Sequence, residues 1–125
     1  MMAEVVDMGA ERVLVCNGDG PLIDAEARAT DLVGDALGVG ASMIAVPTAC
    51  LAPAFFQLRT GLAGAVAQKV VNYRMRLAVV GDISAEVAAS DALRDWVVES
   101  NRRGEVLFVA DLADLAARLG GASGT

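Results

Sequence analysis

The chain has 125 residues, with 10 basic and 16 acidic side chains, a formal charge of −6 and no histidine. This length fits one domain with one core, and no apolar run reaches the roughly 18 to 20 residues of a membrane-spanning helix. The acidic balance argues against nucleic-acid binding, and the lack of histidine removes the commonest general base and metal ligand. We therefore expect no nucleic acid, membrane, metal or cofactor among its partners, and no catalytic residues.

The first part of the chain predicts a β-hairpin followed by a helix. Residues 4–8 and 11–16 form two short strand-like segments, separated by a glycine-containing turn. Apolar side chains then recur at helical spacing from Asp24, and Gly38 or Gly40 ends the pattern.

The middle of the chain alternates between strand and helix. The apolar run 42–46 predicts a buried strand, and Pro53 fits the first turn of a small helix that continues through Leu58. A longer helix is predicted from Thr60, a suitable N-cap, to about Tyr73.

The last part of the chain adds two strands and two helices. Residues 77–80 and 106–109 are short apolar runs typical of buried strands. The helix between them is expected to begin at Ser84 or Ser90, and Asp111 is the predicted N-cap of the final helix. The order ββαβαβαβα predicts an α/β fold with a mostly parallel sheet covered by helices.

These elements indicate one domain over residues 1–125, with a frayed tail at about residues 120–125. The first residues lack the basic and apolar regions of a secretory signal, which favours a cytoplasmic location. The segment 17–20 has the look of a nucleotide-binding loop, but no complete phosphate-binding motif follows it.

The two cysteines, Cys16 and Cys50, lie at a strand end and in an apolar loop. Their spacing fits neither a CxxC motif nor a zinc site, and no histidine could complete a catalytic pair. We expect both to be buried structural thiols.

Six motifs are spread along the chain between Glu4 and Leu119. They are Asp19-Gly20-Pro21, Phe55-Phe56-x-Leu58-x-Thr60-Gly61-x-Ala63-Gly64, Gln68-Lys69-x-x-Asn72-Tyr73-Arg74, Leu77-Ala78-Val79-Val80-Gly81-Asp82, Ala92-Leu93-Arg94-Asp95 and Glu99-Ser100-Asn101-Arg102. With these motifs the chain resembles a bacterial family catalogued as domain of unknown function 4180. The resemblance implies the fold and assigns no function.

The order of elements is also similar to that of the STAS domain of anti-sigma factor antagonists. The resemblance implies a small partner-binding switch that is phosphorylated on a serine at a helix start. The Asp-Ser-Ser-Gly-Leu motif of these domains falls on residues 58–62, where Leu58 replaces the aspartate and Arg59 replaces the phosphorylated serine. Thr60 is the neighbouring hydroxyl, so a phosphorylation switch at Thr60 is a third, weaker hypothesis.

Residues 55–74 hold more polar and glycine residues than a core helix needs, so we expect a working surface there. Arg59 and Thr60 could bind a carboxylate or phosphate at the helix N-terminus, or be a surface arginine and an N-cap. Gly61 and Gly64 would leave a bare strip against which the sheet, another subunit or a ligand packs.

The end of the same helix carries Gln68, Asn72, Tyr73 and Arg74. These residues could form an edge that binds a peptide or ligand, and capping of helix carbonyls explains them equally well. Asp82 follows a predicted parallel strand, where α/β sheets bind ligands, although it could also cap the next helix.

The leading hypothesis is a small cytoplasmic, non-enzymatic domain that binds a protein or peptide partner and forms a homodimer. The candidate binding residues are Phe56, Arg59, Thr60, Gly61, Gln68, Asn72, Tyr73, Arg74 and Asp82.

The alternative is an accessory enzyme or small-ligand-binding protein, for example in natural-product or peptide maturation. Its substrate would be oriented by Arg59, Thr60, Asn72 and Asp82. This alternative predicts a pocket at the carboxyl ends of the strands.

Overall fold

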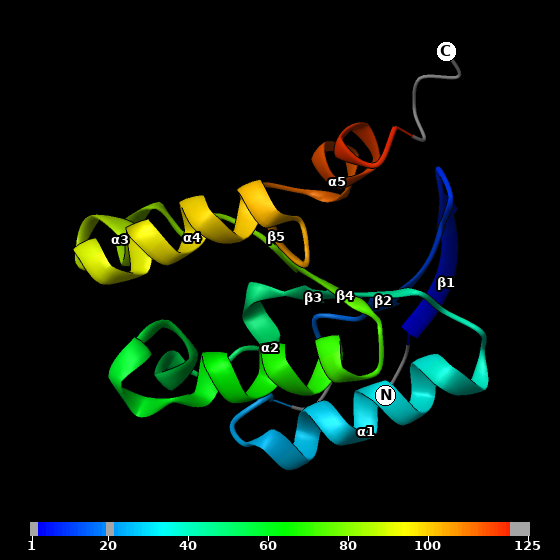
Figure 1. Cartoon of the computed structure of the whole chain (residues 1–125), viewed down its shortest axis with the longest axis horizontal. Coiled ribbons are helices and arrows are strands. Elements are labelled where there is room, and N and C mark those ends of the chain that lie inside the picture. Colours follow the sequence, from blue (N-terminus) through cyan, green and yellow to red (C-terminus); the bar gives the residue numbers. More distant parts are fainter. Residues whose placement is uncertain (1–2, 20–21, 121–125) are drawn as a thin grey trace.

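The sheet is built in chain order, so that each strand lies beside the one before it (Figure 1). The computed structural model describes residues 3–19 and 22–120. Its strands are β1 (Ala3–Met8), β2 (Glu11–Cys16), β3 (Met43–Pro47), β4 (Arg76–Val80) and β5 (Val106–Val109). β1 pairs with β2 in antiparallel fashion, and every later pair is parallel. The expected α/β fold with a mostly parallel sheet is confirmed.

The helices follow the strands as the sequence pattern predicts. They are α1 (Glu26–Gly38), α2 (Leu62–Asn72), α3 (Ser84–Ala88), α4 (Asp91–Arg103) and α5 (Leu112–Arg118). Three short 3₁₀ helices lie between β3 and α2, namely η1 (Thr48–Cys50), η2 (Pro53–Phe56) and η3 (Leu58–Thr60). Asp111 is the N-cap of α5, since its Oδ1 accepts a hydrogen bond from the Asp114 backbone N–H at 2.8 Å.

Several helix boundaries differ from the prediction. The small helix expected from Pro53 through Leu58 ends at Phe56, as the 3₁₀ helix η2, and η3 follows it. The helix expected between β4 and β5 is divided in two, because Ser90 has extended backbone and caps α4 by accepting from the Leu93 N–H at 3.1 Å. α2 begins at Leu62, two residues after the expected Thr60, because Gly61 is left-handed with a φ of +79°. Of the expected tail at 120–125, all but Gly120 lies outside the described residues, as does the Gly20-Pro21 part of the first turn.

Each central strand is buried on both of its faces, which explains its unbroken apolar sequence. In β3, Ile44 and Val46 belong to one apolar cluster, while Met43 and Ala45 belong to another. All four side chains are at most 1% exposed. The first cluster lies under α1 and α2, and the second under α5, which is on the opposite side of the sheet (Figure 1).

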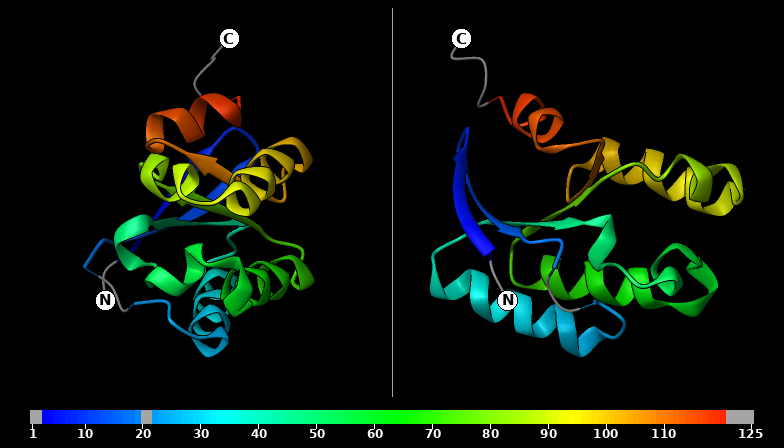
Figure 2. Two further views of the ribbon diagram at one scale, coloured as in Figure 1. Left: turned by 90° about the vertical axis from the view of Figure 1, so that its left-hand side faces the viewer. Right: turned by 180° about the vertical axis from the view of Figure 1, so that it is seen from behind.

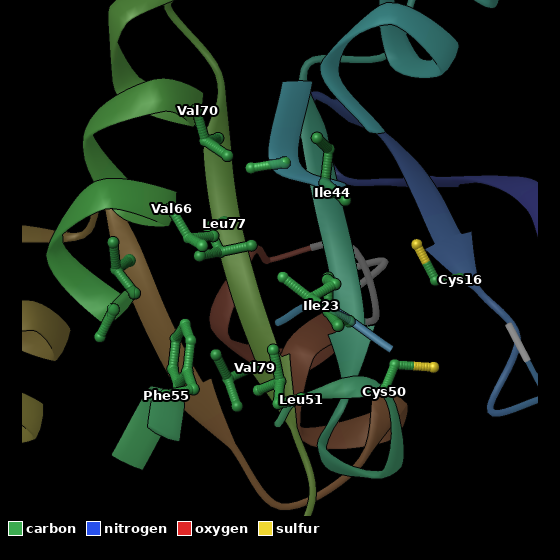
Figure 3. Close-up of a cluster of buried hydrophobic side chains, with 14 of the residues drawn as sticks. Cys16, Ile23, Ile44, Cys50, Leu51, Phe55, Val66, Val70, Leu77 and Val79 are labelled. Carbon is green, nitrogen blue, oxygen red and sulfur yellow. The ribbon is translucent and has the colours of Figure 1, made fainter. Parts of the chain in front are cut away.

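The three 3₁₀ helices, residues 48–60, are called the 3₁₀ segment below. The first cluster connects this segment to the rest of the core. Phe55 of η2 is fully buried and lies in the same cluster as Val66 of α2 and Val79 of β4 (Figure 3). Its ring centre is 6.2 Å from that of Trp96 on α4, and Trp96 meets Phe108 of β5 edge-on at 5.3 Å. These rings fix the 3₁₀ segment relative to α4 and β5.

Both cysteines are buried in this cluster, at 7% exposure for Cys16 and 3% for Cys50 (Figure 3). The Cys50 thiol donates to the Asn17 carbonyl at 3.1 Å. Burial is the main cause that raises the pKa of Cys16 to about 12, and Cys50 and Asp35 raise it further. The expectation of buried thiols is confirmed.

The ends of β3 and β4 are held together by an unusually close contact. Gly81, which directly follows β4, has a φ of +144°, and a Cβ at this position would lie 2.5 Å from Oγ1 of Thr48. Only glycine permits both the backbone conformation and the approach of the Thr48 side chain. Position 81 therefore sets how closely the 3₁₀ segment lies to the end of β4.

We expect Gly81→Ala to lower the free energy of unfolding by about 2 kcal/mol, because the new methyl group meets Thr48 and the backbone is strained. Urea unfolding followed by the fluorescence of Trp96 measures this change. Gly34→Ala is the matched control, since Gly34 lies in α1 with open space around its Cα. That variant should gain up to about 1 kcal/mol from helix propensity. Equal stabilities of the two variants would contradict the packing described here.

We expect Cys16 to react with iodoacetamide at pH 8 far more slowly in the folded protein than in urea. A pKa of about 12 leaves roughly one thiol in ten thousand ionised at that pH, and burial also blocks access. The folded state retains the thiol proton of Cys16 above the ordinary pKa of 9.0. The contribution of this thiol to the free energy of unfolding is therefore fully present below pH 9 and is lost between pH 9 and about 12. Peptide mass spectrometry measures the labelling, and rapid labelling of Cys16 in the folded protein would contradict the assignment.

Candidate functional site

A cleft of about 720 Å³ lies beyond the carboxyl ends of β3 and β4. One wall comes from the 3₁₀ segment that follows β3, and the other from Asp82, α3 and the start of α4. Figure 2 shows these two segments on either side of the same end of the sheet. The carboxyl ends of parallel strands are the usual place for ligands in α/β folds, and the volume is typical of ligand pockets.

The 3₁₀ segment supplies a largely apolar surface to this cleft. Leu51, Pro53, Phe56 and Leu58 all line it. The half-buried ring of Phe56 meets the buried ring of Phe55 edge-on, with the centres 5.3 Å apart. The apolar wall is therefore fixed to the core.

Arg59 on η3 brings a positive charge to the same wall. Its side chain is exposed, and no ion pair or hydrogen bond joins its guanidinium to another residue in 3–19 or 22–120. Most basic residues of the chain do pair with a carboxylate, as Arg76 does with Glu11 at 2.9 Å. The guanidinium of Arg59 is thus available to an anionic group.

The opposite wall carries two carboxylates, Asp82 and Glu86. Asp82 Oδ1 accepts from the Ser84 backbone N–H at 2.9 Å. Hydrogen bonds from the side chain and backbone of Ser84 lower the pKa of Asp82, so this carboxylate stays ionised at neutral pH. Asp82 therefore holds the turn that starts α3 and also faces the cleft.

Thr60 has a structural role beside the cleft. Its Oγ1 lies 2.7 Å from the Ala54 carbonyl and 2.8 Å from the Gln57 carbonyl, and it accepts from the Leu62 N–H at 3.3 Å. The hydroxyl thus closes the turn between η2 and α2, and Thr60 is not among the cleft-lining residues. Gly61 serves the same turn through its left-handed backbone.

Close packing against the expected glycine strip is not found among the described residues. A Cβ built at Gly61 or Gly64 would meet no described atom within 4 Å beyond its chain neighbours and the backbone of its own helix. Gly64 instead lines a smaller cavity of about 240 Å³ between α2 and α4, together with Gln68 and Trp96.

The other predicted binding residues lie at the far end of α2. Gln68 Nε2 donates to Asn72 Oδ1 at 2.7 Å, Tyr73 is 49% exposed, and Arg74 has a φ of +61°. Gln68 and Asn72 belong to the second half of α2, and Tyr73 and Arg74 follow its end, whereas Arg59 lies before its start. The single expected surface is therefore two, and only Phe56, Arg59 and Asp82 of the predicted residues share the cleft.

The sequence reasoning missed Thr48 and Glu86, which also line the cleft. A signal for each was present. Thr48 directly follows a predicted strand and its Pro47, so the rule that pointed to Asp82 also applies to it. Glu86 falls in the first turn of the helix that the sequence predicts from Ser84, just after Asp82.

Two of the residues that line the cleft carry hydroxyl groups. These residues are Thr48 and Ser90, and the Ser90 hydroxyl is engaged as the cap of α4. The Thr48 hydroxyl has no hydrogen-bond partner in the part of the chain that the structure describes, so no general base lies in contact with it. Within the same part, no three His, Cys, Asp or Glu side chains gather as metal ligands, and no helix is long and apolar enough to span a membrane.

Comparison with known families gives one match. The family model described as Domain of unknown function (DUF4180) matches residues 8–119, which is most of the chain. No curated protein and no solved structure matches the chain, so the similarity to STAS domains stays a prediction. With its motifs and its fold in place, the chain belongs to the DUF4180 family of domains of unknown function.

Proposed function

We propose that this protein is a non-catalytic binding domain whose cleft receives a short peptide, with a carboxylate of that peptide on Arg59. The observation that carries the proposal is the guanidinium of Arg59, which has no ion pair or hydrogen bond among the described residues and lies on a wall with Phe56 and Leu58. A charge-assisted, bidentate contact with a carboxylate satisfies such a group, and the apolar wall supplies contact area for the rest of the ligand.

The walls of the cleft are supported from behind, which favours binding with little reorganisation. Phe55 anchors η2 in the core, Thr60 closes the following turn, and Ser84 holds Asp82. Each of these residues supports a neighbour that faces the cleft. A preformed site of this kind loses little conformational entropy when the ligand enters.

The same cleft also supports the alternative of a small-ligand-binding protein. Its volume of about 720 Å³ holds a drug-sized molecule as readily as a few residues of peptide. The two functions share Arg59 and differ in the size of the ligand. A homodimer and a cytoplasmic location remain separate predictions, with no residue of the cleft required for either.

Affinity selection from a random tripeptide-to-hexapeptide library, read by mass spectrometry, tests the proposal. We expect the wild type to retain peptides and Arg59→Ala to retain them at least about tenfold less, which is the usual loss for a charged hydrogen bond.

The matched control is Arg118→Ala, because Arg118 pairs with Asp114 on α5, on the other side of the sheet. This variant should retain the peptides as the wild type does. Retention of no peptide by the wild type, or equal losses in both variants, would overturn the proposal. Retention of small organic molecules from a cell extract, with no peptide, would favour the small-ligand alternative.

A further inference from the structure

We propose that the ligand of the cleft is a zwitterion with separated charges, namely a short apolar peptide with a free amino end and a free carboxyl end. Its carboxylate binds Arg59, and its ammonium group binds Asp82 and Glu86. This inference rests on the proposed function and adds the carboxylates that bind the ammonium end of the ligand, which form the second charged pole of the cleft.

The two walls carry opposite charges. Arg59 comes from η3, whereas Asp82 and Glu86 come from the turn after β4 and the first turn of α3. The three groups are the charged residues among those that line the cleft. A ligand that spans it therefore meets a cation at one side and two anions at the other.

The opposite charges do not neutralise each other. Among the described residues, no ion pair joins Arg59 to Asp82 or Glu86, although eight other basic side chains of the chain form such pairs. Arg59 is therefore too far from Asp82 and Glu86 for a direct ion pair, and the charges on both walls are available to a ligand. A ligand with complementary charges at its two ends satisfies both walls at once.

The groups between the poles specify the body of the ligand. Leu51, Phe56 and Leu58 offer apolar contact, which favours apolar side chains. The Thr48 hydroxyl, unpaired in the described structure, can donate to or accept from a peptide amide. In a short peptide the ammonium group and the carboxylate lie at opposite ends, further apart than in a free amino acid, so a peptide can place one charge on each wall.

Local structure keeps the carboxylate wall of the cleft ionised. The hydrogen bonds from Ser84 keep Asp82 charged at neutral pH, so an ammonium group meets a carboxylate there. Glu86 has no ion-pair partner among the described residues and adds a second acceptor.

The test uses the full chain and a mixture of apolar tripeptides in four forms, with both ends free, the amino end acetylated, the carboxyl end amidated, or both ends blocked. Retained amounts are measured by mass spectrometry. We expect each single block to reduce retention about tenfold, and the double block to abolish it.

Two variants test which charged residues of the cleft bind which end of the peptide. In Arg59→Ala, amidation should have no further effect while acetylation still weakens binding. In Glu86→Gln, the penalty for acetylation should fall while the penalty for amidation persists. Glu4→Gln is the matched control, because Glu4 is an exposed residue of the edge strand β1 and does not line the cleft; it should behave as the wild type.

The outcomes separate this inference from the proposed function. Retention of acetylated peptides equal to that of free peptides, with Arg59 still required, would overturn the zwitterion and leave the peptide-binding function intact. Retention of free leucine equal to that of tripeptides would overturn the requirement for separated charges. Retention of none of the four forms would overturn both proposals.

Discussion

The parallel pairing of β3 with β4 is the constraint on which the rest of the structure depends. Its register places Pro47 beside Val80, so that the residues after them, Thr48 and Gly81, meet at the same edge of the sheet. Because Gly81 lacks a Cβ, the Thr48 side chain can lie against its backbone. After β3 the chain continues into the 3₁₀ segment, and after β4 it continues into α3. These two segments lie on opposite sides of the sheet edge, and the cleft lies between them.

The cleft also depends on residues that do not face it. Phe55 is fully buried, and its neighbour Phe56 lines the cleft, so one side chain fixes the position of the next. Trp96 makes the corresponding link from α4 to Phe55 and β5. The same aromatic contacts that stabilise the core therefore set the distance between the two walls. A change in the core at these rings would alter the site without touching any ligand-facing group.

Local sequence signals were sufficient for the strands, and for caps such as Asp111, because each depends on neighbouring residues alone. They were insufficient for the surface around α2. Arg59 and Arg74 flank one predicted helix, from Thr60 to about Tyr73, and its pattern did not separate them into two surfaces. Which polar residues share a cleft depends on long-range pairing of strands, and no periodicity within one segment contains that information.

No ion pair among the described residues crosses the cleft, although the chain is otherwise rich in ion pairs. Exposed ion pairs contribute little to stability, so leaving Arg59 unpaired costs the fold almost nothing. Beside a largely apolar surface, however, the same charge interacts more strongly with a bound ligand than it would on an open surface, because the ligand displaces water. An arrangement that is neutral for folding can thus be favourable for binding. For this reason we interpret the opposed charges of the cleft, which form no ion pair with each other among the described residues, as groups for a ligand rather than for the stability of the domain.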